Sequence, residues 1–150
     1  MAKVMDELDR RILSLIQYNA RASFAKIAKR LGVSEGTIHI RVKKLQERGV
    51  IKGFYTILSP EKLNKSLTAF IAIKVNPLEY QDVLSKLIEV PDIYEIHDVT
   101  GEFYAILKVR TRDKDSLAKI IDQIGAIKGV LSTQTMVVLR TVKEQLTVTI

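Results

Sequence analysis

Cationic and hydrogen-bonding side chains gather between residues 34 and 52 of this 150-residue chain. Lysine and arginine side chains neutralise phosphates, and short polar side chains near an open helix N-terminus can reach base edges in the major groove of DNA. A basic helix face is often only a solvated surface, so the pattern needs support from neighbouring elements. The candidate DNA-binding residues are Ser34, Glu35, Gly36, Thr37, His39, Arg41, Lys43, Lys44 and Lys52.

Two short helices and a tight turn are predicted to carry these residues. Apolar residues at offsets of 0, 3, 4 and 7 from Phe24 predict a first helix, which ends at Gly32 because glycine readily adopts positive φ. Ser34 is suited to cap a second helix, whose inner residues are apolar at helical spacing and which ends at Gly49. Two capped helices, a glycine turn and a basic second helix together predict a DNA-reading helix-turn-helix.

Further elements flank this pair. Upstream, apolar residues at helical spacing follow Asp6, a suitable cap, and predict another helix that completes a three-helix unit. Downstream, residues 50–58 are β-branched and aromatic, which predicts a strand leading out of the unit. Ser59 and Pro60 then mark a turn or the start of a short helix, and residues 59–66 are expected to be a linker.

The second half of the chain has the order strand, helix, strand, strand, helix, strand. Helical spacing of apolar residues predicts helices at 79–89 and 113–124. The predicted strands are 67–75, 93–99, 103–110 and 130–140. This order is typical of a ferredoxin-like βαββαβ domain whose first and third strands are central.

The expected fold is therefore α+β, with a helix-turn-helix (winged-helix-like) domain joined by a strand linker to a ferredoxin-like domain. The expected boundaries are 1–52 for the helix-turn-helix domain, 53–66 for the strand and linker, and 67–150 for the second domain. Both alternating sets of strand residues contain apolar side chains, such as Ile71 on one face and Phe70 on the other. A second copy of the chain is the simplest cover, so at least a homodimer is expected.

Charge is unevenly distributed along the chain, whose formal net charge is +7. Residues 1–58 hold 12 Lys and Arg against 5 Asp and Glu, whereas residues 59–150 hold 12 against 12. Such asymmetry indicates a nucleic-acid-binding end and a neutral end with another task. Because the basic residues lie on a segment with its own apolar core, no membrane partner is expected.

Other chemistries find little support. His39 and His97 lie in different predicted domains, cysteine is absent, and no serine lies in a nucleophile-elbow motif, so no enzymatic activity is expected. Neither a metal-ligand cluster nor a phosphate-binding glycine loop is visible, and no cofactor is predicted. The lack of cysteine and of an N-terminal apolar stretch long enough for a signal peptide predicts a cytoplasmic protein.

Seven short motifs spread along the chain resemble one known family. They are 8–13 (LDRRIL), 19–21 (NAR), 33–37 (VSEGT), 41–45 (RVKKL), 49–53 (GVIKG), 99–103 (VTGEF) and 130–135 (VLSTQT). By order and spacing they resemble the Lrp/AsnC family of leucine-responsive and asparagine-responsive transcriptional regulators. The resemblance implies a winged or strand-extended helix-turn-helix, dimers that often assemble into octamers, an amino-acid effector bound between effector domains of neighbouring dimers, and no enzymatic chemistry.

Two positions depart from the family pattern. Glu35 follows the cap serine where the family commonly has proline, and Tyr104 stands where it commonly has an acidic residue. An acidic group at that second position would suit the ammonium of an amino acid, and tyrosine carries no full negative charge near neutral pH. The identity of the effector therefore stays open.

Polar residues in the second domain nevertheless suit a zwitterion, which needs donors for its carboxylate and acceptors for its ammonium. The 100–101 turn offers accessible backbone, its flanks offer carboxylates, and residues 132–135 interrupt an apolar strand with polar side chains. The alternative is that 132–135 mark a solvated strand end and that the glycine serves only the turn. The candidate ligand-binding residues are Asp98, Thr100, Gly101, Glu102, Tyr104, Ser132, Thr133, Gln134 and Thr135.

Two classes of function follow from the sequence. The first is a sequence-specific transcriptional regulator whose DNA affinity or oligomeric state responds to an amino acid. The second is a small-molecule-binding regulatory subunit of an enzyme, and an architectural DNA-binding protein is a variant of the first. Salt dependence separates them, because binding through lysine and arginine releases counterions from DNA.

Overall fold

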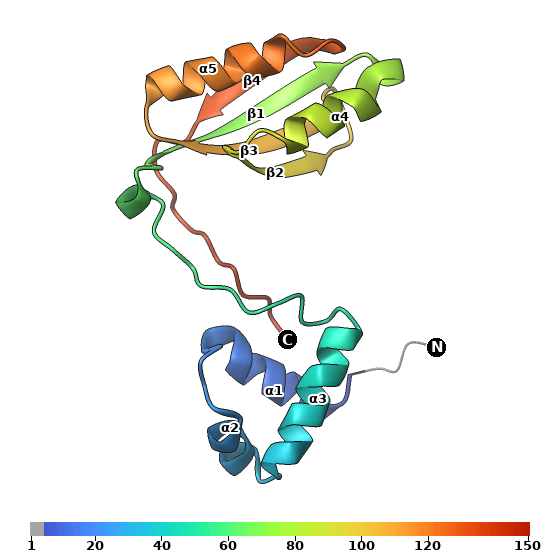
Figure 1. Cartoon of the computed structure of the whole chain (residues 1–150), viewed down its shortest axis with the longest axis vertical. Coiled ribbons are helices and arrows are strands. Elements are labelled where there is room, and N and C mark those ends of the chain that lie inside the picture. The colour runs from blue at the N-terminus through green and yellow to red at the C-terminus, as the bar shows by residue number, and fades with distance from the viewer. Residues whose placement is uncertain (1–4) are drawn as a thin grey trace. The chain divides into compact units, whose positions relative to one another are not determined.

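The computed structural model describes residues 5–150, and these divide into two compact units (Figure 1). One unit contains the N-terminal residues up to Ile57 together with Lys143–Ile150, and the other contains Leu58–Val142. The association of the last eight residues with the N-terminal unit was not predicted from the sequence. None of the helices within residues 5–150 is long and apolar enough to cross a membrane.

Three helices form the N-terminal unit: α1 (Glu7–Tyr18), α2 (Phe24–Leu31) and α3 (Glu35–Glu47). The predicted caps are confirmed for α1 and α3, because Asp6 accepts a hydrogen bond from the amide of Asp9 and Ser34 accepts one from the amide of Thr37. The predicted end of α2 is also confirmed, since Gly32 has a φ of 70°. The buried apolar core of the unit comprises Ile12, Ile16, Ile27, Ala28, Ile38 and Val42.

The strand predicted at 50–58 is not formed. The amides of Val50 and Ile51 donate instead to the carbonyl of Leu45 at the end of α3, at 2.9 and 3.1 Å. A strand needs a neighbour to complete its ladder, and none of the described residues pairs with this segment. The prediction was wrong because β propensity alone supplies no partner.

The second unit begins with a short 3₁₀ helix, η1 (Glu61–Leu63), which confirms the turn or helix start predicted at Ser59 and Pro60. The elements that follow are β1 (Leu67–Val75), η2 (Pro77–Glu79), α4 (Tyr80–Ile88), β2 (Ile93–Asp98), β3 (Ala105–Thr111), α5 (Lys114–Gly125) and β4 (Val130–Val137). The sheet is antiparallel with strand order β2-β3-β1-β4, so the predicted central position of the first and third strands is confirmed.

The two helices α4 and α5 cover one face of this sheet (Figure 1). Ile71 and Ile73 on β1 and Leu107 on β3 are fully buried beneath them. Gly129, just before β4, has a φ of 100°, and a Cβ atom there would lie 2.7 Å from the Cβ of Glu79. A residue without a side chain is therefore needed where the chain enters β4.

The opposite face of the sheet carries no helix from this chain. Cross-strand register places Phe70, Ile106 and Met136 on it, together with Lys74 and Lys108. Met136 is 45% exposed, and Phe70 and Ile106 are partly buried. We call this the open face; it is apolar in part, as predicted, but interrupted by charges.

Candidate DNA-binding and ligand-binding sites

The N-terminal turn of α3 is open and capped. The hydroxyl of Ser34 lies 2.8 Å from that of Thr37 and also accepts from the amide of Thr37 at 3.1 Å. Gly36 is exposed, and a Cβ atom there would touch nothing closer than Ser34 Oγ at 3.9 Å. The first turn thus presents small groups that another molecule could approach closely.

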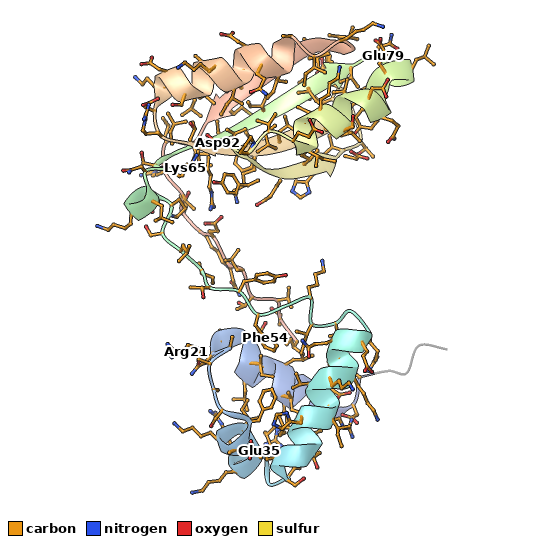
Figure 2. The ribbon with its side chains drawn as sticks, in the orientation of Figure 1. Arg21, Glu35, Phe54, Lys65, Glu79 and Asp92 are labelled. Carbon is orange, nitrogen blue, oxygen red and sulfur yellow. The ribbon has the colours of Figure 1, made fainter. Side chains whose placement is uncertain are left out.

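One turn further along, the ring of His39 is exposed and packs edge-on against Phe24, with ring centroids 4.6 Å apart. Its Nε2 lies 3.7 Å from a carboxylate oxygen of Glu35, one turn earlier on α3. Figure 2 shows Glu35 at the end of α3 that lies beside α2. Phe24 therefore helps to hold an imidazole at the edge of the open turn.

Arg41 does not lie on the outer face of α3, where the sequence placed it. Its guanidinium forms an ion pair with Asp6 and lies 3.1 Å from Asp9 Oδ1. The hydrogen bond from the amide of Asp9 and that from Arg41 lower the pKa of the Asp6 carboxyl, and the hydrogen bond to Asp6 raises the pKa of Arg41. Asp9 is buried, so this cluster is an internal tie between α1 and α3.

The other predicted cations lie on the surface of the N-terminal unit. Lys43 is exposed and its Nζ lies 3.9 Å from a carboxylate oxygen of Glu47, and Lys44 and Lys52 are also exposed. With Arg41 turned inward, α3 presents only two lysines. Charged groups on α3 are therefore less favourable to phosphate binding than the sequence suggested.

Sequence reasoning missed a second basic surface on α2. Lys26, Lys29 and Arg30 are all exposed on that helix, and Arg21 is exposed in the turn before it. The sequence pattern could have predicted this surface, because offsets of 0, 3 and 4 place three cations on one face of a helix. These cations lie opposite the apolar stripe of α2 that begins at Phe24.

Among the predicted ligand-binding residues, Asp98 and Tyr104 meet at one end of the sheet beside Tyr80 of α4. The hydroxyl of Tyr80 donates to Asp98, and its ring centroid lies 5.5 Å from that of Tyr104. Burial, with the adjacent Asp98 carboxylate, raises the pKa of Tyr80 to about 12. The result is a carboxylate beside two aromatic rings, with Asp98 also lining a groove between α4 and β2.

The turn between β2 and β3 holds three further candidates. Thr100 and Gly101 are exposed, and Gly101 has a φ of 113° with nothing within 4 Å of a Cβ position. Glu102 forms an ion pair with Lys74 of β1. The glycine is thus required by the backbone conformation of the turn, and the space above it is open.

Residues 132–135 do not form one polar patch. Ser132 pairs in register with Lys74 of β1, and Gln134 pairs with Ala72 of β1, so both lie on the open face. Thr133 and Thr135 are opposite the core residues Ile73 and Ile71, beneath the helices. Successive strand residues point to opposite faces, so only two of the four can meet a ligand from the same side.

Comparisons with known proteins agree with this architecture. The AsnC-type helix-turn-helix domain model matches residues 5–46, and the Lrp/AsnC ligand binding domain model matches residues 68–148. HTH-type transcriptional regulator FL11 of Pyrococcus abyssi is 44% identical over 140 residues, which cover 93% of each chain. Its Pyrococcus furiosus counterpart is 39% identical and covers 96% of this chain and 95% of its own.

Solved structures are similar over nearly the whole length. AsnC of E. coli is 34% identical with a TM-score of 0.91, covering 95% of this chain and 97% of its own. The feast or famine regulatory protein of M. tuberculosis, solved in complex with L-methionine, is 26% identical with a TM-score of 0.89, covering 96% and 98%.

A helix-turn-helix unit joined to a ligand-binding sheet domain defines a ligand-responsive DNA-binding transcriptional regulator, which is not an enzyme. This chain belongs to the Lrp/AsnC family.

Proposed function

We propose that the chain recognises a specific DNA sequence through the first turns of α3. The observation that carries this proposal is the capped, open N-terminus of α3 on a packed three-helix unit. In this proposal Thr37 and His39 contact base edges, while Lys43, Lys44 and Lys52 contact phosphates. The remaining contacts come from the residues of the cap, which are Ser34, Glu35 and Gly36.

The effector in this proposal is an amino acid bound in the sheet domain. Support comes from the ligand-binding family model and from the L-methionine complex of the mycobacterial relative. Asp98, held by Tyr80, supplies the negative charge that Tyr104 cannot, and the exposed 100–102 turn supplies backbone donors. Ser132 and Gln134 belong to the open face, while Thr133 and Thr135 lie on the other face and contribute to packing.

The proposed assembly is a homodimer that associates further, up to an octamer, in the cytoplasm. The apolar residues of the open face support a dimer, because a second copy would remove them from water. A two-fold dimer presents two α3 helices to a pseudo-palindromic site.

The deciding experiment is titration of the full-length protein onto DNA from upstream of its own gene, at several salt concentrations, with and without the common amino acids. Salt-sensitive binding that outcompetes random DNA and shifts with amino acids supports the proposal. Binding without sequence preference would indicate an architectural protein. No binding at low salt would contradict DNA recognition and favour a regulatory subunit of an enzyme.

The effector site is tested separately with Gly101→Val. A β-branched residue is strained at a φ of 113°, so the turn must rearrange. We expect the response to amino acids to be lost while DNA affinity in their absence stays within about twofold of the parent, a shift of about 0.4 kcal/mol. A full response in this variant would place the effector site elsewhere.

A further inference from the structure

We propose that the basic face of α2 supplies more of the phosphate contacts than α3 does when this protein binds DNA. We call Lys26, Lys29 and Arg30 the α2 stripe. The inference rests on the proposed function, since it assigns the electrostatic part of DNA binding to a surface beside the recognition helix. Its partner is the phosphate backbone of double-stranded DNA.

The α2 stripe is directed outward by the packing of its own helix. Ile27 and Ala28, on the opposite side of α2, are 3% and 4% exposed and belong to the core of the unit. Three cations at offsets of 0, 3 and 4 then share the solvent face. Figure 2 shows Arg21 directed away from the helices in the turn before α2.

The charge balance favours α2 over α3. Helix α2 contains three cations and no acidic residue, whereas α3 contains three cations and two acidic residues. The chain has no acidic residue between Asp9 and Glu35, a stretch that holds six lysines and arginines. A surface of one sign attracts a polyanion more strongly than a mixed one.

The cations of α2 also form fewer ion pairs within the protein than those of α3. On α3, Arg41 is paired with Asp6, and Lys43 lies 3.9 Å from a carboxylate oxygen of Glu47. Within residues 5–150, none of the three cations of the α2 stripe forms an ion pair. Binding to DNA therefore costs no internal partner at α2, whereas Arg41 would have to leave a buried carboxylate.

Because α2 and α3 are adjacent in the chain, both can contact the same DNA site. The last residue of α2, Leu31, is separated from Glu35, the first residue of α3, by three residues that include Gly32. When the N-terminus of a recognition helix enters the major groove, the preceding helix crosses the adjacent backbone. The α2 stripe is then presented to the phosphates that flank that groove.

The test compares two charge-matched triple variants of the full chain. The first is Lys26→Gln, Lys29→Gln and Arg30→Gln on the α2 stripe. The second is Lys86→Gln, Lys114→Gln and Lys119→Gln, three exposed lysines of the sheet domain, which removes the same net charge. Fluorescence anisotropy with the upstream DNA gives the slope of log affinity against log salt for each protein.

We expect the α2 variant to lose up to about 2.7 from that slope for each bound chain, since each phosphate contact contributes about 0.9. The sheet-domain variant should keep the parent slope. Equal slopes in all three proteins would overturn the inference while leaving DNA binding intact. Failure of the parent protein to bind at the lowest salt would instead overturn the proposed function, and this inference with it.

Single substitutions test the same inference with less risk that the variant fails to fold. Lys26→Gln, Lys29→Gln and Arg30→Gln should each lower the slope by about 0.9, with melting temperatures close to that of the parent. Single variants with unchanged slopes and parent-like melting would also overturn the inference.

Discussion

Arg41 illustrates how a charged side chain can be engaged by the protein's own carboxylates rather than by its ligand. Its position is three residues after Ile38 and four before Leu45, both of which are fully buried. The same helical spacing therefore places it beside the inner stripe of α3, where it reaches Asp6 and Asp9. Local spacing could not predict this ion pair, because the carboxylates that hold Arg41 lie more than thirty residues away in the sequence.

The first prediction concerns this ion cluster. Arg41→Ala removes the partner of the buried Asp9 carboxylate, so we expect the melting temperature to fall by roughly 5 °C. DNA affinity should fall because α3 loses its tie to α1, but the salt slope should stay near that of the parent. Circular dichroism melts and anisotropy titrations measure the two effects.

Arg10→Ala is the matched control, because it removes an exposed arginine of α1 and should leave the melting temperature unchanged. A slope reduced by about 0.9 for Arg41→Ala, with parent-like melting, would show that Arg41 contacts a phosphate after all.

At the level of elements, helix caps and turns explain why much of the fold could be predicted. Asp6 and Ser34 begin their helices as expected, and β1 has the predicted bounds. The strand predicted at 50–58 was wrong because a strand depends on a pairing neighbour, which no local pattern specifies. The prediction of one polar patch at 132–135 was wrong because successive strand residues alternate between the two faces of the sheet.

The cap of α5 leads to a prediction about pH. Hydrogen bonds from the Ser116 side chain and amide, with the Arg112 guanidinium, hold the pKa of the Asp113 carboxyl well below its ordinary value of 3.8. A lowered pKa stabilises the fold above the ordinary value, and that stabilisation is lost as pH falls below it. Asp113→Ala should therefore lower the melting temperature by roughly 5 °C at pH 7 and by less at pH 3.

Asp115→Ala removes an exposed carboxylate from the same turn and serves as its control. A melting-temperature difference between parent and Asp113→Ala that is the same at pH 7 and pH 3 would rule out the capping carboxylate as its cause.

Two glycines near the end of α5 give a paired prediction. Gly129→Ala places a Cβ atom 2.7 Å from Glu79 and strains a φ of 100°, so we expect a melting temperature lower by roughly 5–10 °C. Gly125→Ala meets nothing within 4 Å and should leave melting unchanged or raise it slightly. Equal effects of the two substitutions would contradict the close approach at Gly129.

At the level of the whole molecule, the open face leads to a prediction about assembly. Phe70→Glu places a charge among the apolar residues of that face, so a dimer formed there should dissociate at micromolar concentration. Sedimentation velocity measures the change. Leu78→Glu is the control, because Leu78 is 93% exposed on η2 and its substitution should leave the oligomeric state unaltered. A Phe70→Glu protein that remains dimeric would move the interface to another surface.

The two apolar cores share no residue, since one is built from the three N-terminal helices and the other from the sheet with α4 and α5. Each core can therefore absorb heat in its own calorimetric peak. A ligand that binds one unit stabilises it by about 2.7 kcal/mol at one hundred times its Kd. The melting temperature of that unit's peak therefore rises, and the other peak stays where it was if the two units are not coupled. In a scan, DNA would shift the helical peak and an amino acid the other, and any joint shift would measure the free energy that couples the two sites.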